Sequence, residues 1–238
     1  MKDTRDNIIR CYDDFVEALL NAGFSMGGSN NEDIYAIINW GWQEEPPFDT
    51  PLRWHCGNPD IDPWEWRMRV LDERNDIAYG KLFFKKSGYI TRQWYPYFLV
   101  ARRGAASLDE AYENGTISHF AKRIYDVVVK NDTLPLHGIK ELAGFSKEDK
   151  SGFDRALTEL QMRMFLTMCG RQQKLSQKGE EYGWSSTIFC TTERFFGDDI
   201  FKEADEITKE EALKKIREQI LKLNPKAQDK KINKFILG

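Results

Sequence analysis

Two aspartates, two tryptophans and two arginines lie close together between Asn58 and Arg69, in the order Asn-Pro-Asp-Ile-Asp-Pro-Trp-Glu-Trp-Arg-Met-Arg. Aromatic rings can stack on a nucleobase, and a guanidinium group can attract its phosphates. A carboxylate can stabilise the cationic sugar that forms when an N-glycosidic bond breaks, or activate the attacking water. The candidate catalytic residues are Asp60 and Asp62. The candidate nucleic-acid contacts in this segment are Trp64, Arg67 and Arg69.

The same segment carries the signal of a helix start. Asp62 suits an N-cap and Pro63 the first helical position, and a glutamate stands at the third. Asp60 then belongs to the preceding turn. Apolar and charged residues alternate after Pro63 as in a strand, but proline is tolerated in a strand only at a sheet edge, so we favour a helix. In a helix, Trp64 and Trp66 point to different sides, and one of them belongs to the core.

Composition limits the class of protein. The chain has 238 residues, of which 41% are hydrophobic and 13% aromatic, which is enough for a packed core. No apolar run of about 18 residues occurs, so no membrane span is expected. Four scattered cysteines without a Cys-x-x-Cys pair predict no structural metal and no disulfide framework, and hence a cytoplasmic protein. No cofactor is expected.

Charge is distributed unevenly along the chain. The net charge is −3, yet residues 209–238 contain nine Lys/Arg and four Asp/Glu, a local excess of five positive charges. Residues 1–208 therefore carry −8. A basic tail on an acidic body is compatible with a nucleic-acid partner and equally with a solvated helix face.

Apolar spacing predicts the elements of the first half. Ile8, Tyr12, Phe15 and Leu19 form one face of a helix that should end at Gly23. Residues 76–86 are predicted to form a strand or a buried helix, and residues 91–103 a helix. Residues 104–115 are polar, and we expect a connection and a domain boundary there.

The helices and strands predicted for residues 116–196 follow a recognisable order. A helix from about residue 118, an extended piece at 133–136 and a short helix at 137–143 are followed by a third helix carrying Phe153, Leu157 and Leu160. Two strands, at 165–169 and 184–191, then flank a polar loop. This order is that of a winged helix, in which the third helix enters a DNA major groove and the loop is the wing.

Basic side chains follow the third helix and the predicted wing. Such side chains suit phosphate oxygens, which supply affinity and position rather than sequence readout. Winged helices also serve as protein-contact modules, so both kinds of partner stay open. The candidate phosphate contacts are Lys150, Arg155, Arg163, Arg171, Lys174 and Lys178.

These residues support a family resemblance. The chain resembles the AlkZ/YcaQ-type winged-helix DNA glycosylases, in the divergent group of AlkZ-related proteins. Asp60-Ile61-Asp62-Pro63 corresponds to that family's Gln-apolar-Gln or Gln-apolar-Asp motif, with Asp60 in place of the first Gln. Residues 81–86 and 94–98 resemble its "LFEYW…YP" region. The resemblance implies a double-stranded DNA partner and a relation to glycosylases that excise alkylated bases. The alternative function is a non-catalytic DNA-binding or protein-interaction scaffold.

Together these patterns predict an α+β protein, mostly helical, with a winged-helix domain and short antiparallel strands. The predicted division is an N-terminal α+β region at 1–112, the winged helix at 113–200 and a basic amphipathic helical tail at 201–238.

Overall fold

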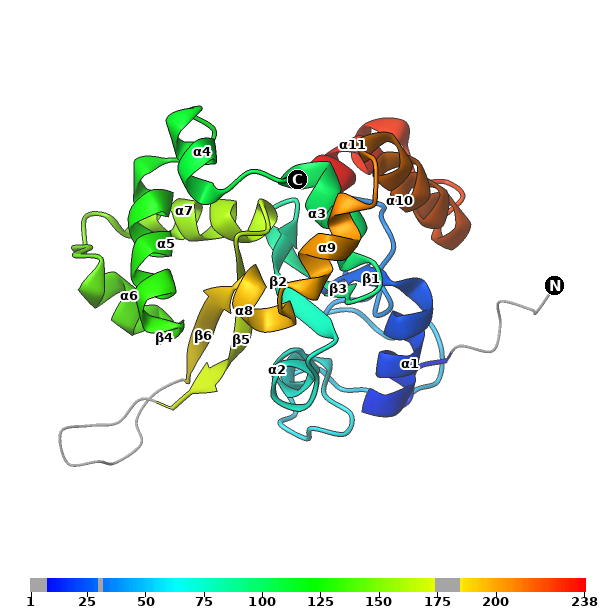
Figure 1. The fold of residues 1–238 in the computed structure, drawn as a ribbon. Coiled ribbons are helices and arrows are strands. Elements are labelled where there is room, and N and C mark those ends of the chain that lie inside the picture. The colour runs from blue at the N-terminus through cyan, green and yellow to red at the C-terminus, as the bar shows by residue number, and fades with distance from the viewer. Residues whose placement is uncertain (1–7, 30–31, 174–184) are drawn as a thin grey trace, which may run out of the picture.

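The computed structural model describes residues 8–29, 32–173 and 185–238. These residues contain eleven helices and one six-stranded antiparallel sheet (Figure 1). The prediction of an α+β fold is confirmed. The strands are β1 Phe24–Met26, β2 Ile77–Phe83, β3 Lys86–Thr91, β4 Thr133–Pro135, β5 Leu166–Gln172 and β6 Ser186–Thr191. The helices are α1 Tyr12–Ala22, α2 Pro63–Glu73, α3 Tyr95–Arg102, α4 Leu108–Glu113, α5 His119–Asn131, α6 Leu136–Leu142, α7 Lys150–Met162, α8 Thr192–Phe196, α9 Asp199–Asp205, α10 Lys209–Leu223 and α11 Asp229–Leu237.

The six strands follow the order β1-β3-β2-β5-β6-β4, so the sheet is continuous across the predicted boundary near residue 112. Strands β2 and β3 form a hairpin, and β2 meets β5 where Tyr79 pairs with Met168. Both β4 and β5 pair with β6. The chain before residue 112 and the chain after it therefore share one sheet, while the division at residues 112 and 200 stays a prediction.

Helices cover both faces of β1, β3 and β2. Because successive side chains of a strand point to opposite faces, Tyr79 and Tyr89 pack against α1 and α2. Ala78 and Ile90 belong to the other face, where α3, α10 and α11 pack (Figure 1). Helix α1 ends at Gly23, as the sequence predicts, and the φ of 87° at Gly23 makes a left-handed C-terminal cap.

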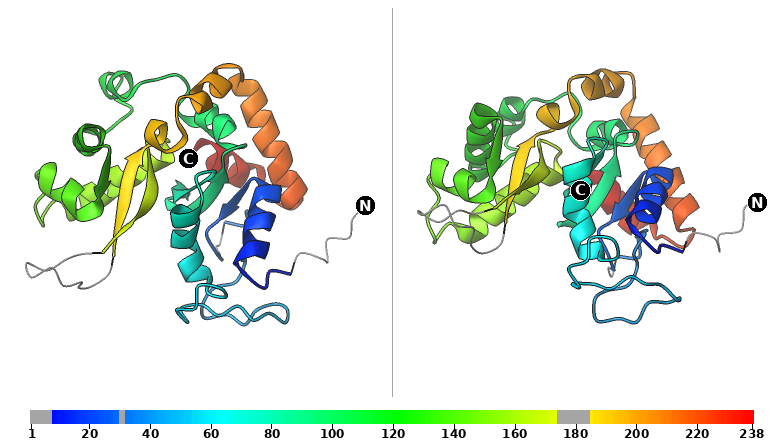
Figure 2. Two further views of the ribbon diagram at one scale, coloured as in Figure 1. Left: turned by 60° about the horizontal axis from the view of Figure 1, so that its bottom comes forward. Right: turned by 90° about the horizontal axis from the view of Figure 1, so that it is seen from below.

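A third core lies around α5, α6, α7, β5 and β6, where Ile124, Phe153, Leu160 and Phe189 are buried. The elements from α5 to β6 occur in the predicted order. Figure 2 shows the strands β5 and β6 between the helices α5–α7 on one side and α2 with β2 on the other. The strand predicted for residues 76–86 is β2, so the alternative of a buried helix is wrong there.

The polar connection predicted at residues 104–115 is wrong in its second half, where α4 forms. Ser107 and Glu110 make a reciprocal capping box, and this box satisfies the first N–H groups of the helix. Leu108 and Ala111 bury one face of α4 in the third core. The short strand β1 is a further element that the sequence does not reveal. Within the described residues, no helix has the length and apolar content that a membrane crossing requires.

Candidate nucleic-acid interface

Asp62 is the N-cap of α2, as the sequence predicts, and its side chain is fully buried. Its Oδ1 accepts hydrogen bonds from the backbone N–H groups of His55 at 3.0 Å and Trp64 at 2.9 Å. Its Oδ2 accepts one from the N–H of Gly57 at 2.9 Å. Both carboxylate oxygens therefore hold the loop from residue 55 to α2, and this loop includes the left-handed His55 with a φ of 57°.

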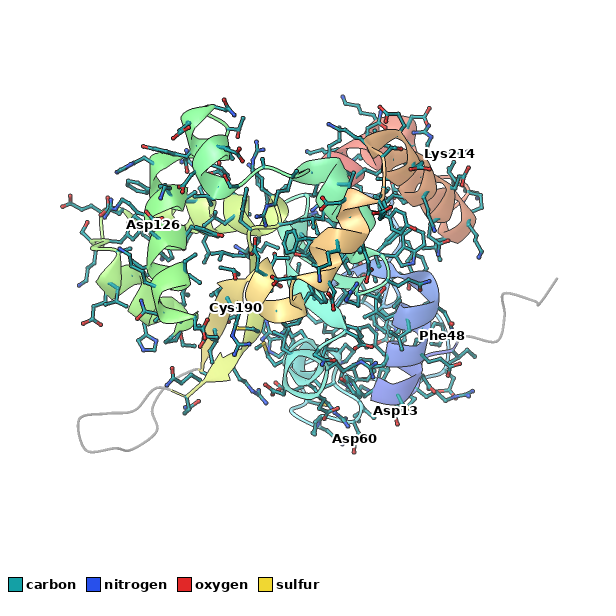
Figure 3. The ribbon with its side chains drawn as sticks, in the orientation of Figure 1. Asp13, Phe48, Asp60, Asp126, Cys190 and Lys214 are labelled. Carbon is teal, nitrogen blue, oxygen red and sulfur yellow. The ribbon has the colours of Figure 1, made fainter. Side chains whose placement is uncertain are left out.

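Asp60 differs from Asp62 in its surroundings. Its side chain is 76% exposed, at the lower edge of the molecule in Figure 3. Its backbone N–H donates to Asn58 Oδ1 at 3.0 Å, which makes the turn that the sequence predicts. Arg69 Nη1 lies 3.3 Å from Asp60 Oδ1, and Arg69 Nε donates to Glu73 at 2.8 Å. Asp60 is thus the solvent-accessible aspartate of the motif, with a guanidinium group beside it.

Trp64 and Trp66 point to different sides of α2, as predicted for a helix. Trp66 is fully buried against Phe15, and its Nε1 donates to the Pro59 carbonyl at 2.9 Å. Trp64 is 37% exposed. The guanidinium carbon of Arg67 lies 3.2 Å from the centre of the Trp64 ring, so it covers one ring face. Trp64 is therefore the tryptophan of this pair that a ligand can reach.

Arg171 of β5 lies against α2. Its guanidinium nitrogens are 3.6 Å from Glu65 Oε2 and 3.4 Å from Asp72 Oδ2. Two carboxylates of α2 therefore partly neutralise Arg171, the side chain that the sequence predicts to contact a phosphate. The predicted wing contacts Lys174 and Lys178 lie outside the described residues.

Basic side chains in and around α7 line a cavity of about 600 Å³. Arg155 and Arg163 are exposed there, and Lys150 is exposed at the start of the helix. Lys81 and Lys85, from β2 and the turn after it, line the same cavity, whose lining contains no residue of 58–69. The predicted contacts therefore form two groups, one around α2 and one along α7.

Lys81 and Lys85 are site residues that sequence reasoning did not identify. They enclose the apolar run Leu82–Phe84, and this Lys-Leu-Phe-Phe-Lys pattern was the available signal. Four cationic side chains that line the cavity form no ion pair with an acid among the described residues: Lys81, Lys85, Arg155 and Arg163.

Arg102 forms the inner part of the cavity. Its guanidinium group donates to four backbone carbonyls, those of Leu82 at 2.7 Å, Met162 at 3.1 Å, Phe235 at 2.6 Å and Ile236 at 2.8 Å. Burial lowers the pKa of Arg102 to about 9, so the group stays protonated at neutral pH. Arg102 therefore joins β2, α7 and α11 beneath the basic surface.

Metal-ligating side chains do not gather in the described part of the chain in groups of three or more. The described geometry therefore consists of a loop organised by Asp62, an exposed Asp60 and a cavity beside α7 that several cations line. These features define an α+β protein with a cationic cavity beside one helix.

The chain belongs to the AlkZ-related family, since the family model described as "AlkZ related" matches residues 9–237. This match confirms the resemblance to AlkZ-related proteins that was drawn from the sequence. Comparison with curated proteins and with solved structures gave no match.

Proposed function

We propose that this protein binds double-stranded DNA through a winged helix at residues 119–191, in a chain related to DNA glycosylases that excise alkylated bases. The membership of the AlkZ-related family supports this relation. The order α5-β4-α6-α7-β5-β6, with β4 and β5 both paired to β6, supports the winged helix. In this proposal α7 is the helix that enters the major groove.

The observation that carries the proposal is the set of four cations that line the cavity beside α7, namely Lys81, Lys85, Arg155 and Arg163, and that form no ion pair with an acid among the described residues. A protein surface usually offsets lysine and arginine by nearby acids, as Arg171 and Arg69 are offset here. A cluster in which cations outnumber acids raises the local potential and attracts polyanions. The lining also contains two carboxylates, those of Asp154 and Glu159. Glu159 accepts hydrogen bonds from the Ser118 N–H at 3.2 Å and the Ser118 hydroxyl at 2.6 Å, so its carboxylate is bound to the residue that caps the start of α5.

The dimensions of α7 fit this role. Thirteen residues give a helix of roughly 20 Å, and the major groove, about 12 Å wide, accepts a helix. Arg155 and Arg163 would contact phosphates from the helix, and Lys81 and Lys85 from the adjoining hairpin. These contacts supply affinity and position, whereas they carry no base sequence information.

Asp62 has a positioning role in this proposal. Each of its oxygens already accepts backbone N–H groups, so neither is available to activate a water without the loss of the loop. Asp60 is the carboxylate of the motif that a reacting sugar or water could approach.

Fluorescence anisotropy with a labelled duplex tests the proposal. The variants Lys81→Ala, Arg155→Ala and Arg163→Ala should each weaken binding several-fold, since each removes one phosphate contact. Lys214→Ala is the control for the loss of one exposed positive charge elsewhere on the protein. Lys214 lies on α10 (Figure 3), 4.0 Å from Glu218, and is not among the residues that line the cavity. Equal affinities for all four variants and the wild type would exclude α7 as the binding surface.

The exposure of Asp60 favours a second candidate function, the excision of alkylated bases. In this function Asp60 would stabilise the cationic sugar or activate the water, with Arg69 beside it. Abasic-site formation on alkylated duplex is the measurement, with Asp60→Asn as the inactive variant. A wild type that cleaves no lesion of a broad panel would leave the non-catalytic DNA-binding function.

A further inference from the structure

Two cysteines meet where β5 and β6 pair. Cys190 lies in β6, opposite Thr167 (Figure 3). Met168 pairs with Phe189 and Gly170 with Ile188, so Cys169 is the additional residue of a β-bulge in β5. The two side chains are therefore neighbours on the β5–β6 pair, and each thiol shifts the pKa of the other.

The two thiols have different surroundings. Cys190 is 1% exposed, whereas Cys169 is half-buried and can be reached by a small molecule. Cys190, acting as a hydrogen-bonding neighbour, holds the pKa of Cys169 below its ordinary value, and the nearby positive charge of Arg194 acts in the same direction. The influence of Cys169, together with burial, raises the pKa of Cys190. Arg194 in turn lies 3.4 Å from Asp132.

We propose that Cys169 and Cys190 are a modification site, a thiol pair that hydrogen peroxide converts to a reversible disulfide between β5 and β6. The inference does not depend on DNA binding. Thiolates are the nucleophiles in such chemistry, and Cys169 is the cysteine of the pair that is both accessible and favoured as a thiolate. Cys190 is the resolving thiol, which the strand register places beside Cys169.

The chemistry balances in two steps. The Cys169 thiolate attacks one peroxide oxygen, the O–O bond breaks, and the products are a sulfenic acid on Cys169 and, after protonation, water. The sulfur of Cys190 then attacks the Cys169 sulfur, the S–O bond breaks, and the proton of Cys190 leaves with the hydroxyl as a second water. Two thiols are oxidised by two electrons and one peroxide is reduced. A dithiol such as dithiothreitol then reduces the disulfide back to the two thiols and is itself oxidised to a disulfide.

The test treats the folded full-length chain with hydrogen peroxide, blocks the remaining thiols with an alkylating reagent under denaturing conditions, and measures the intact mass. We expect two of the four cysteines to escape alkylation and a proteolytic fragment that links Cys169 to Cys190. Dithiothreitol added before alkylation should restore all four thiols. A product in which the exposed Cys56 is oxidised while Cys169 and Cys190 both remain alkylatable would overturn the inference.

Single variants separate the roles of the two cysteines. Cys190→Ser should leave Cys169 as a sulfenic acid that dimedone traps, because the resolving thiol is gone. Cys169→Ser should leave the buried Cys190 unoxidised under the same treatment. Cys56→Ser is the control and should form the linked fragment at the wild-type rate. If Cys190→Ser gives no dimedone adduct while the protein keeps its circular dichroism spectrum, Cys169 is not the attacking thiol.

Discussion

The Asp62 carboxylate accepts a 2.9 Å hydrogen bond from the backbone N–H of Trp64 and so fixes the first turn of α2. Asn at this position keeps the shape but places an N–H donor where a carboxylate oxygen accepts. We expect Asp62→Asn to lower the free energy of unfolding by about 1–3 kcal/mol, the usual range when a buried hydrogen bond to a charged group is lost. Urea unfolding measures this loss.

Asp60→Asn is the matched variant at the exposed aspartate. Its ion pair with Arg69 lies at the surface, so the free energy of unfolding should change by no more than about 0.5 kcal/mol. Equal losses in the two variants would show that Asp62 is not the structural member of the motif.

Arg171 and Arg155 should differ in their effect on DNA affinity. The charge of Arg171 is already offset by Glu65 and Asp72, whereas Arg155 has no acidic partner among the described residues. We therefore expect Arg171→Ala to weaken duplex binding less than Arg155→Ala does. Asp72→Asn should strengthen binding, because it releases part of the Arg171 charge. A larger loss from Arg171→Ala would place the main contact at β5 instead of α7.

Arg102 should contribute more to stability than its surface neighbours on the cavity wall. Arg102→Ala removes the donor for four backbone carbonyls and leaves them without that partner. We expect a loss of about 2–4 kcal/mol in the free energy of unfolding, measured in urea. Arg102→Lys keeps the charge but not the planar fork, so its loss should be intermediate. Unfolding of both variants at the wild-type midpoint would contradict this role.

Tyr12 should make the protein less stable at alkaline pH. Burial, aided by the charge of Glu73, raises the pKa of Tyr12 to about 12 from an ordinary value of 10.0. Above pH 10 the unfolded chain therefore loses a proton that the folded protein retains, and the stability of the fold falls as the pH rises. The Tyr12 hydroxyl has no hydrogen-bond partner among the described residues, so Tyr12→Phe loses no bond. Urea unfolding from about pH 9 to about pH 11 should show a smaller decline for Tyr12→Phe.

Signals that lie close together in the sequence predicted much of the fold. The cap at Asp62, the proline after it and the opposite orientations of Trp64 and Trp66 depend on a single helix turn. The order of elements from α5 to β6 follows from apolar spacing and turn residues in the same way. The end of α1 at Gly23 was predictable because the left-handed region favours glycine.

Features that depend on distant contacts were not predictable. The cavity combines Lys81 and Lys85 with α7, some 70 residues later in the chain, and nothing in either segment indicates the other. The ion pairs between Arg171 and the acids of α2 were not predictable for the same reason, since these residues lie far apart in the sequence. The contact of Cys169 with Cys190 depends on a bulge, which shifts the register between two strands.

The dependence of duplex affinity on salt tests the central claim most directly. Each phosphate contact contributes about 0.9 to the slope of log K against log salt, because counterions leave the DNA. We expect a clearly negative slope for the wild type, and a slope smaller by roughly 2 for Arg155→Ala/Arg163→Ala. Lys214→Ala should keep the wild-type slope. A wild-type affinity that does not change with salt, or the same slope for the double variant, would contradict DNA binding by the basic surface of α7.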